Sequence, residues 1–119
     1  MRTLPELLRW RARRHPHVEA LRENGRATTY AELDASTTAL ANGLISQGVS
    51  PGDRVAILDK NSAAYLELLW AVSKTGAVAA PINWRLVQRE VHRIASDAGA
   101  RMIVCSELPA RIQRLTARV

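Results

Sequence analysis

The chain has 119 residues, of which 47% are hydrophobic, enough for one small folded domain and too many for a disordered segment. Seventeen basic residues against eleven acidic ones give a net charge of +6, a balance that raises the question of nucleic-acid or anionic-membrane contact. The single cysteine excludes an internal disulfide framework, and we expect a soluble protein in the reducing cytoplasm.

The first predicted element is a helix from about Leu4 to His15. Thr3 and Glu6 have the spacing of a capping box, with Pro5 in the first turn. The opening residues "MRTLPELLRWRARRHPH" lack the apolar run and cleavage site of a signal peptide. We expect one apolar face on this helix, formed by Leu4, Leu7, Leu8 and Ala12.

A β-hairpin is predicted over residues 18–30, because two short extended runs flank Asn24 and Gly25, a pair that suits a type I′ turn. A second capping box, formed by Thr29 and Glu32, begins a helix that stops at Gly48. The core positions of this helix follow 3.6-residue spacing and are Tyr30, Leu33, Thr37, Leu40, Ala41 and Leu44.

Strands and helices alternate through the rest of the chain. Apolar strands are predicted at Arg54–Leu58, Ala77–Ile82 and Arg101–Cys105. The helix between the first two, from about Ser62 to Thr75, is apolar almost all round, and we expect it to be buried on most sides. None of the apolar runs reaches the roughly 20 residues that span a bilayer.

Two further helices are predicted. One is amphipathic and ends at Gly99, with Val87, Val91, Ile94, Ala95 and Ala98 on one face. The other closes the chain and carries Leu108, Ile112 and Leu115. The alternation predicts an α/β fold, a small parallel sheet flanked by helices plus an N-terminal β-hairpin. Three parallel strands make a thin core, which suggests that a neighbouring part is missing.

Motifs for catalysis are mostly absent from the sequence. The six glycines are isolated, so neither a dinucleotide loop nor a Walker-type phosphate loop can be formed from them. Lys74-Thr75-Gly76 matches the KTG triad of penicillin-binding enzymes, but no serine stands three residues before a lysine, as that site requires. We interpret these residues as a helix end with a glycine stop.

Asp59 follows a strand, as the phosphoacceptor of a receiver domain does, but the acidic pair and late lysine of that site are missing. We therefore expect Asp59 and Asn61 to cap the next helix. Metal binding is not favoured by the spacing of the remaining candidate ligands, which are His15, His17, His92 and Cys105. We expect the histidines to be structural or exposed and Cys105 to be a buried, inert thiol.

The clustered arginines are Arg9, Arg11, Arg13 and Arg14. No RNA-binding signature accompanies them, so we predict a solvated surface and no nucleic-acid partner. Contact with an anionic membrane through this cluster remains an alternative.

Three sequence blocks in a fixed order are similar to a known family. They are "TYAEL" (29–33), "GDRVA" (52–56) followed by Asn61-Ser62, and "GAV" (76–78) with "PINWRL" (81–86). Together they resemble the N-terminal region of the AMP-forming acyl-CoA synthetases, in the adenylate-forming ligase superfamily. The Asn-x-Arg-Leu ending is typical of acyl-CoA synthetases rather than of peptide-synthetase domains. Val87 departs from the small or hydroxyl residue that many relatives have before the next helix.

The resemblance implies an ATP-dependent ligase that activates a carboxylic acid as its adenylate and transfers it to coenzyme A, with ATP, Mg²⁺ and CoA bound by the full-length enzyme. The family's phosphate loop, nucleotide-binding acids and catalytic lysine follow this region. We therefore assign no catalytic, cofactor-binding or metal-binding residue here. Residues 1–119 are expected to be one partial domain, with a helix–hairpin–helix part (1–50) and a βαβ-type part (51–119).

The leading hypothesis is an N-terminal scaffold fragment of a fatty-acid or other carboxylic-acid–CoA ligase, without catalytic activity alone. Its partner would be the rest of the ligase, which would also bind the small-molecule acid. The alternative is a stand-alone interaction module that docks onto a full-length synthetase or onto a second copy of itself. The sequence does not identify the acyl substrate.

Overall fold

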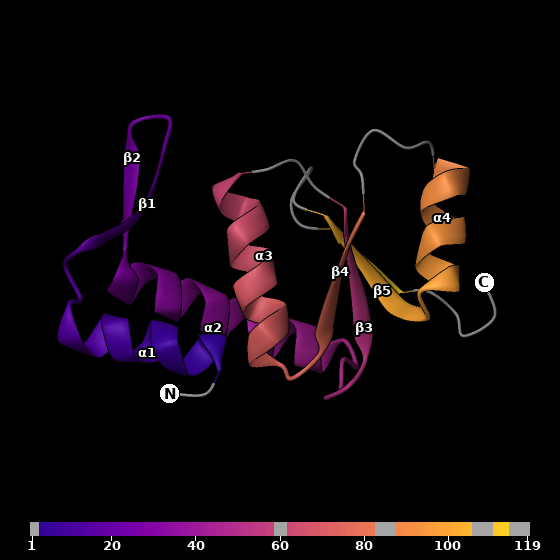
Figure 1. The fold of residues 1–119 in the computed structure, drawn as a ribbon, viewed down its shortest axis with the longest axis horizontal. Coiled ribbons are helices and arrows are strands. Elements are labelled where there is room, and N and C mark those ends of the chain that lie inside the picture. The colour runs from indigo at the N-terminus through magenta and orange to yellow at the C-terminus, as the bar shows by residue number, and fades with distance from the viewer. Residues whose placement is uncertain (1–2, 59–61, 83–87, 106–110, 115–119) are drawn as a thin grey trace.

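The computed structural model describes residues 3–58, 62–82, 88–105 and 111–114 (Figure 1). The helices are α1 (Leu4–Arg14), α2 (Tyr30–Ser46), α3 (Ala63–Lys74) and α4 (Gln88–Asp97). The strands are β1 (Glu19–Glu23), β2 (Arg26–Thr29), β3 (Arg54–Leu58), β4 (Val78–Ile82), β5 (Ala100–Cys105) and β6 (Arg111–Arg114). In these ranges no helix is both long and apolar enough to cross a lipid bilayer.

The first half of the fold follows its local signals. The Thr3 hydroxyl accepts a hydrogen bond from the Glu6 N–H at 3.3 Å and caps α1. β1 and β2 form the predicted antiparallel hairpin, with Asn24 at φ 52° and Gly25 at φ 78° in its turn. The capping box of α2 is complete, because the side chains of Thr29 and Glu32 each accept from the other's backbone N–H.

The main sheet has the strand order β4-β3-β5-β6. β3 lies at its centre and pairs in parallel with β4 and with β5, which confirms the predicted parallel arrangement. β3 has a continuous buried run, Val55 to Ile57, as expected for a parallel strand covered on both faces.

The predicted final helix is wrong, because Arg111–Arg114 forms β6, antiparallel to β5. Met102 pairs with Arg114 and Cys105 with Arg111. A helix prediction based on residue spacing takes no account of the β5 backbone, whose N–H and C=O groups provide partners for a second strand. Ile112 lies within β6, while Leu108 and Leu115 fall outside the described residues.

Two hydrophobic clusters cover the two faces of the sheet. The larger one joins α2 and α3 to alternate residues of β3 and β5: Val55, Ile57, Met102 and Val104. The smaller one lies on the other face, where Ala95 of α4 packs against Ala56, Ile82 and Ile103. Figure 1 shows the same layering, with α3 on one side of the sheet and α4 on the other.

The structure corrects several expected core positions. In α1, Leu8 is buried, but Leu4 and Leu7 are 58% and 39% exposed. In α3, Leu68, Ala71 and Val72 are buried, whereas Leu66 is 39% exposed. α1 lies at the end of the molecule away from α4 and contacts α2 and α3, so its opposite face is uncovered, whereas α3 packs between these helices and the sheet and leaves Leu66 at the side near the hairpin (Figure 1).

Candidate functional site

The carboxyl ends of the parallel strands form the first candidate region. β3, β4 and β5 end at Leu58, Ile82 and Cys105, and ligands of open parallel sheets bind outside such strand ends. The segments that follow, 59–61, 83–87 and 106–110, lie outside the described residues. They include Asp59 and Asn61, so their predicted capping role stays a prediction, as does burial of the Cys105 side chain.

The cap of α3 that the structure describes is Ser62. Its hydroxyl oxygen accepts the Tyr65 N–H at 3.2 Å. Ser62 stands next to the predicted caps and is, like Asp and Asn, one of the residue types preferred at the start of a helix, so the sequence carried a signal for it.

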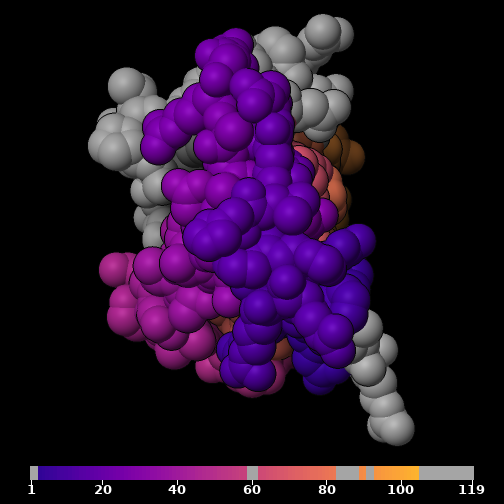
Figure 2. Space-filling model, turned by 90° about the vertical axis from the view of Figure 1, so that its left-hand side faces the viewer, coloured from indigo at the N-terminus to yellow at the C-terminus, as the bar shows by residue number. Residues whose placement is uncertain are grey.

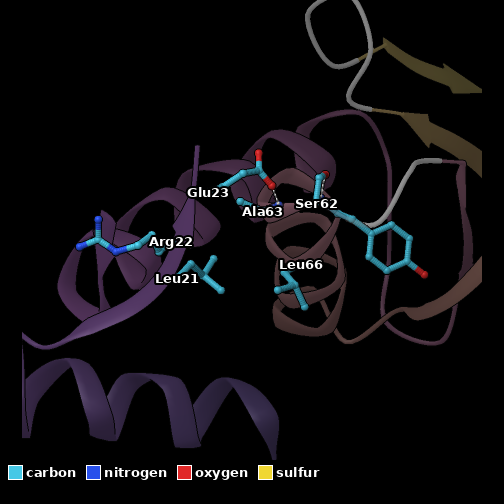
Figure 3. Close-up of a pocket in the computed structure, with 7 residues that line it drawn as sticks. Leu21, Arg22, Glu23, Ser62, Ala63 and Leu66 are labelled. Atoms are coloured by element: carbon cyan, nitrogen blue, oxygen red, sulfur yellow. Dashed lines mark hydrogen bonds between the residues drawn. The ribbon is translucent and has the colours of Figure 1, made fainter. Parts of the chain in front are cut away.

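A groove of about 400 Å³ lies between the hairpin and the first turns of α3. Leu21 of β1 and Leu66 of α3 form its apolar walls, and Figure 3 shows them pointing into the space between the two elements. Glu23, at the end of β1, reaches the N-terminus of α3, where its carboxylate accepts the Ala63 N–H at 2.6 Å (Figure 3).

This groove has a structural role that its hydrogen bonds explain. The N-terminus of a helix attracts anions through its unpaired N–H groups and its dipole. At α3 an internal carboxylate, Glu23, and the Ser62 hydroxyl already accept such N–H groups. A phosphate would have to displace Glu23, so the contact attaches the hairpin to α3.

A polar cluster between α2 and α3 was not predicted. The Lys74 ammonium donates to the Asp34 carboxylate at 2.7 Å, to the Asp34 carbonyl at 2.9 Å and to the Thr38 hydroxyl at 2.7 Å. Three acceptors use all three donors of the ammonium, so Lys74 is not available to a substrate, although it lines a hollow beside the start of α1.

The rest of the KTG-like triad closes the helix as predicted. The Thr75 hydroxyl donates to the Val72 carbonyl at 2.6 Å and accepts the Ala77 N–H at 3.2 Å. Gly76 follows with φ 81°. These bonds satisfy backbone groups at the end of α3.

The histidines that the structure describes do not form a metal site. His15 is exposed at the end of α1, where its ring makes an edge contact with Trp10 at 6.3 Å, and His17 is exposed as well. No group of three or more His, Cys, Asp or Glu residues that could hold a metal ion occurs in the described ranges. The backbone of His92 lies in α4.

Two acidic side chains have lowered pKa values. The Thr29 backbone N–H holds the pKa of Glu32 below its ordinary value of 4.5, and the Thr29 side chain acts in the same direction. The hydrogen bond from Arg22, with its Nε 2.7 Å from the carboxylate, lowers the pKa of Glu19. Both shifts favour the charged carboxylate, whereas a general acid needs the opposite shift.

Comparisons with known proteins agree on one family. The family described as AMP-binding enzyme matches residues 8–118. A feruloyl-CoA synthase of Amycolatopsis sp is 49% identical over 94 residues, which are 79% of this chain and 19% of that protein. The long-chain-fatty-acid–CoA ligase FadD13 of Mycobacterium tuberculosis is 38% identical over 106 residues, 87% of this chain and 21% of that protein.

A solved structure gives the same result. The crystal structure of the N-terminal domain of FACL13 from Mycobacterium tuberculosis superposes with a TM-score of 0.81 at 37% identity. The match covers 88% of this chain and 27% of that one. The chain thus spans about a fifth of the length of the curated relatives and resembles the N-terminal region of adenylate-forming ligases.

Proposed function

Because the chain belongs to the AMP-binding enzyme family, we propose that it is the N-terminal scaffold of an ATP-dependent carboxylic acid–CoA ligase. The family match over residues 8–118 is the observation that carries this proposal. The names of the relatives support the reaction class, since one is a feruloyl-CoA synthase and another a long-chain-fatty-acid–CoA ligase. These two relatives are named for very different acids although both are similar to this chain, so the proposal extends to carboxylic acids as a class.

The scaffold role is supported by the polar side chains, which form hydrogen bonds within the fold. Glu23, Thr29 and Ser62 accept backbone N–H groups where helices begin. Lys74 and Asp34 join α2 to α3. These groups hold elements together, and in this proposal ATP, Mg²⁺, CoA and the acid bind the rest of the ligase.

The proposal is tested by replacing the corresponding segment of the Amycolatopsis feruloyl-CoA synthase with residues 8–118 of this chain. We expect the chimera to catalyse ferulate-dependent ATP–pyrophosphate exchange and to keep its preference for ferulate over a long-chain fatty acid. A matched chimera with Leu44→Asp, which places a carboxylate in the core, should lose activity together with its fold. A folded chimera that loses exchange, or that changes its acid, contradicts a scaffold role.

The isolated chain provides the complementary test. We expect it to show only background exchange with ferulate or with a long-chain fatty acid. Robust acid-dependent turnover by these 119 residues would show that the segment is itself catalytic.

A second candidate function is an interaction module, which the exposed apolar side chains favour. Addition of a second copy to the β4 edge is opposed by the backbone. Val78 donates to the Asp53 carbonyl at 2.7 Å, so by alternation Ala79 and Pro81 direct their backbone groups away from β3. Pro81 has no N–H, which weakens this edge as a template.

Light scattering after size exclusion separates the two functions. The scaffold proposal predicts no specific self-association of the folded chain. A stable dimer that persists on dilution would favour the interaction module.

A further inference from the structure

Helix α1 has two apolar stripes on opposite sides. Leu8, which is 2% exposed, faces α2 and α3. Leu7 and Trp10 are 39% and 37% exposed, and with Arg14 they follow the three- and four-residue steps that place side chains on one helix face. The fold therefore uses one stripe in its core and presents the other to the outside.

Basic side chains lie along α1 beside the exposed stripe, with Arg11 and Arg14 in contact with Trp10. The arginines of α1 are all exposed and are Arg9, Arg11, Arg13 and Arg14. The Arg14 guanidinium carbon lies 5.6 Å from the centre of the Trp10 ring, and that of Arg11 lies 5.7 Å from the Trp10 ring and 5.7 Å from the Tyr30 ring. These distances are those of cation–π contacts, so charge and aromatic surface occur at the same place.

The location of this surface leaves it accessible within the described structure. Figure 2 shows the N-terminal residues, in indigo, across the face of the molecule that lies opposite α4 in Figure 1. Leu4 and Val18, at the two ends of the α1 region, add exposed fractions of 58% and 49%. Glu6 is the one acidic residue of α1, so the helix is strongly basic.

We propose that α1 binds the surface of an anionic lipid membrane, with the arginines on the headgroups and Leu7 and Trp10 in the interface. Interfacial helices combine Lys or Arg with exposed Trp and Leu in this way, and acidic lipids attract each basic residue. A nucleic acid would bind the arginines through its phosphates, but this binding would not require exposed leucines beside them. The inference is independent of the proposed function, because it uses only residues of α1 and its surroundings.

The test is sedimentation of the full chain with phosphatidylcholine vesicles that contain or lack phosphatidylserine. We expect binding to the anionic vesicles only, and less of it as salt shortens the Debye length from about 10 Å at 0.1 M to about 3 Å at 1 M. The variant R9Q/R13Q/R14Q should bind roughly a hundredfold more weakly, at about fivefold per arginine.

Controls separate charge from insertion. R89Q/R93Q, on exposed positions of α4, removes charge elsewhere and should bind like the unchanged chain. Leu7→Gln should weaken vesicle binding at every salt concentration, because it removes insertion and leaves the charge. Circular dichroism should show that each variant is folded.

Three outcomes would overturn the proposal. They are equal binding to both kinds of vesicle, equal losses in the α1 and α4 arginine variants, and no effect of Leu7→Gln together with full competition by duplex DNA. The last result would identify a nucleic-acid surface instead.

Discussion

The Lys74 ammonium of α3 lies 2.7 Å from the Asp34 carboxylate of α2, and the lysine side chain is only 8% exposed. The two residues are 40 positions apart in the chain. Because the ammonium also donates to the Asp34 carbonyl and to Thr38, the charge is removed from water without leaving a donor unpaired. The contact fixes the two helices that cover one face of the sheet.

We expect Lys74→Met to lower the free energy of unfolding by about 2–3 kcal/mol, because it leaves the Asp34 carboxylate without its cation and removes three hydrogen bonds. Urea unfolding followed by circular dichroism measures this. The double variant Lys74→Met/Asp34→Asn should lose less than the sum of the single variants, since the unpaired charge is gone. Strict additivity would show that the pair does not interact.

Gly76 is expected to be the least replaceable of three glycines. Its φ of 81° is strained for other residues, and an added Cβ would lie 3.2 Å from the Pro51 Cβ. At Gly52, φ is 86° but the space for a Cβ is open, so Gly52→Ala should lower the free energy of unfolding by about 1–2 kcal/mol. Gly76→Ala should lower it by more, because the strained φ and the contact with Pro51 act together. Gly43→Ala, inside α2 with nothing within 4 Å, should stabilise by about 0.5–1 kcal/mol. The melting temperature should be highest for Gly43→Ala, lower for Gly52→Ala and lowest for Gly76→Ala. The reversed order would contradict this prediction.

Leu68 and Leu66 of α3 allow a comparison within one helix. Leu68 is 2% exposed, so Leu68→Ala should lower the free energy of unfolding by about 2–4 kcal/mol through lost burial and a cavity. Leu66 is 39% exposed at the groove, and Leu66→Ala should cost less than about 1 kcal/mol. Denaturant unfolding measures both free energies. Similar losses for Leu68→Ala and Leu66→Ala would mean that Leu66 is buried in solution.

The stability of the chain should fall in acid partly through Glu32. Its pKa is lowered in the folded state, so its contribution is present above the ordinary value of 4.5 and is lost as the pH falls through the folded value. Glu32→Gln should therefore have a melting temperature that changes less between about pH 6 and about pH 3 than that of the unchanged chain. Glu67→Gln, in the middle of α3, is the matched control. Parallel pH profiles for all three proteins would contradict the role of the capping box.

The candidate site was predictable only in part. The end of α3 at Thr75 and Gly76 could be read from the sequence, because a helix stop is encoded by adjacent residues. The Lys74–Asp34 pair could not, since nothing in the spacing of two residues so far apart indicates that α2 and α3 pack together. The division at residue 50, the assignment of no site residue and the roles of Asp59 and Cys105 stay predictions.

The sequence by itself determined the caps of α1 and α2, the Asn24-Gly25 hairpin, the strand at Arg54–Leu58 and the parallel βα order, because each depends on residues within a few positions of one another. Only the tertiary structure decided that Arg111–Arg114 pairs with β5 and that Leu7 and Leu66 face outward. Both outcomes depend on segments distant in the chain, which provide the hydrogen-bond partners of a strand and cover, or leave uncovered, the side chains of a helix. Local periodicity states which residues share a face, but not whether another element covers it.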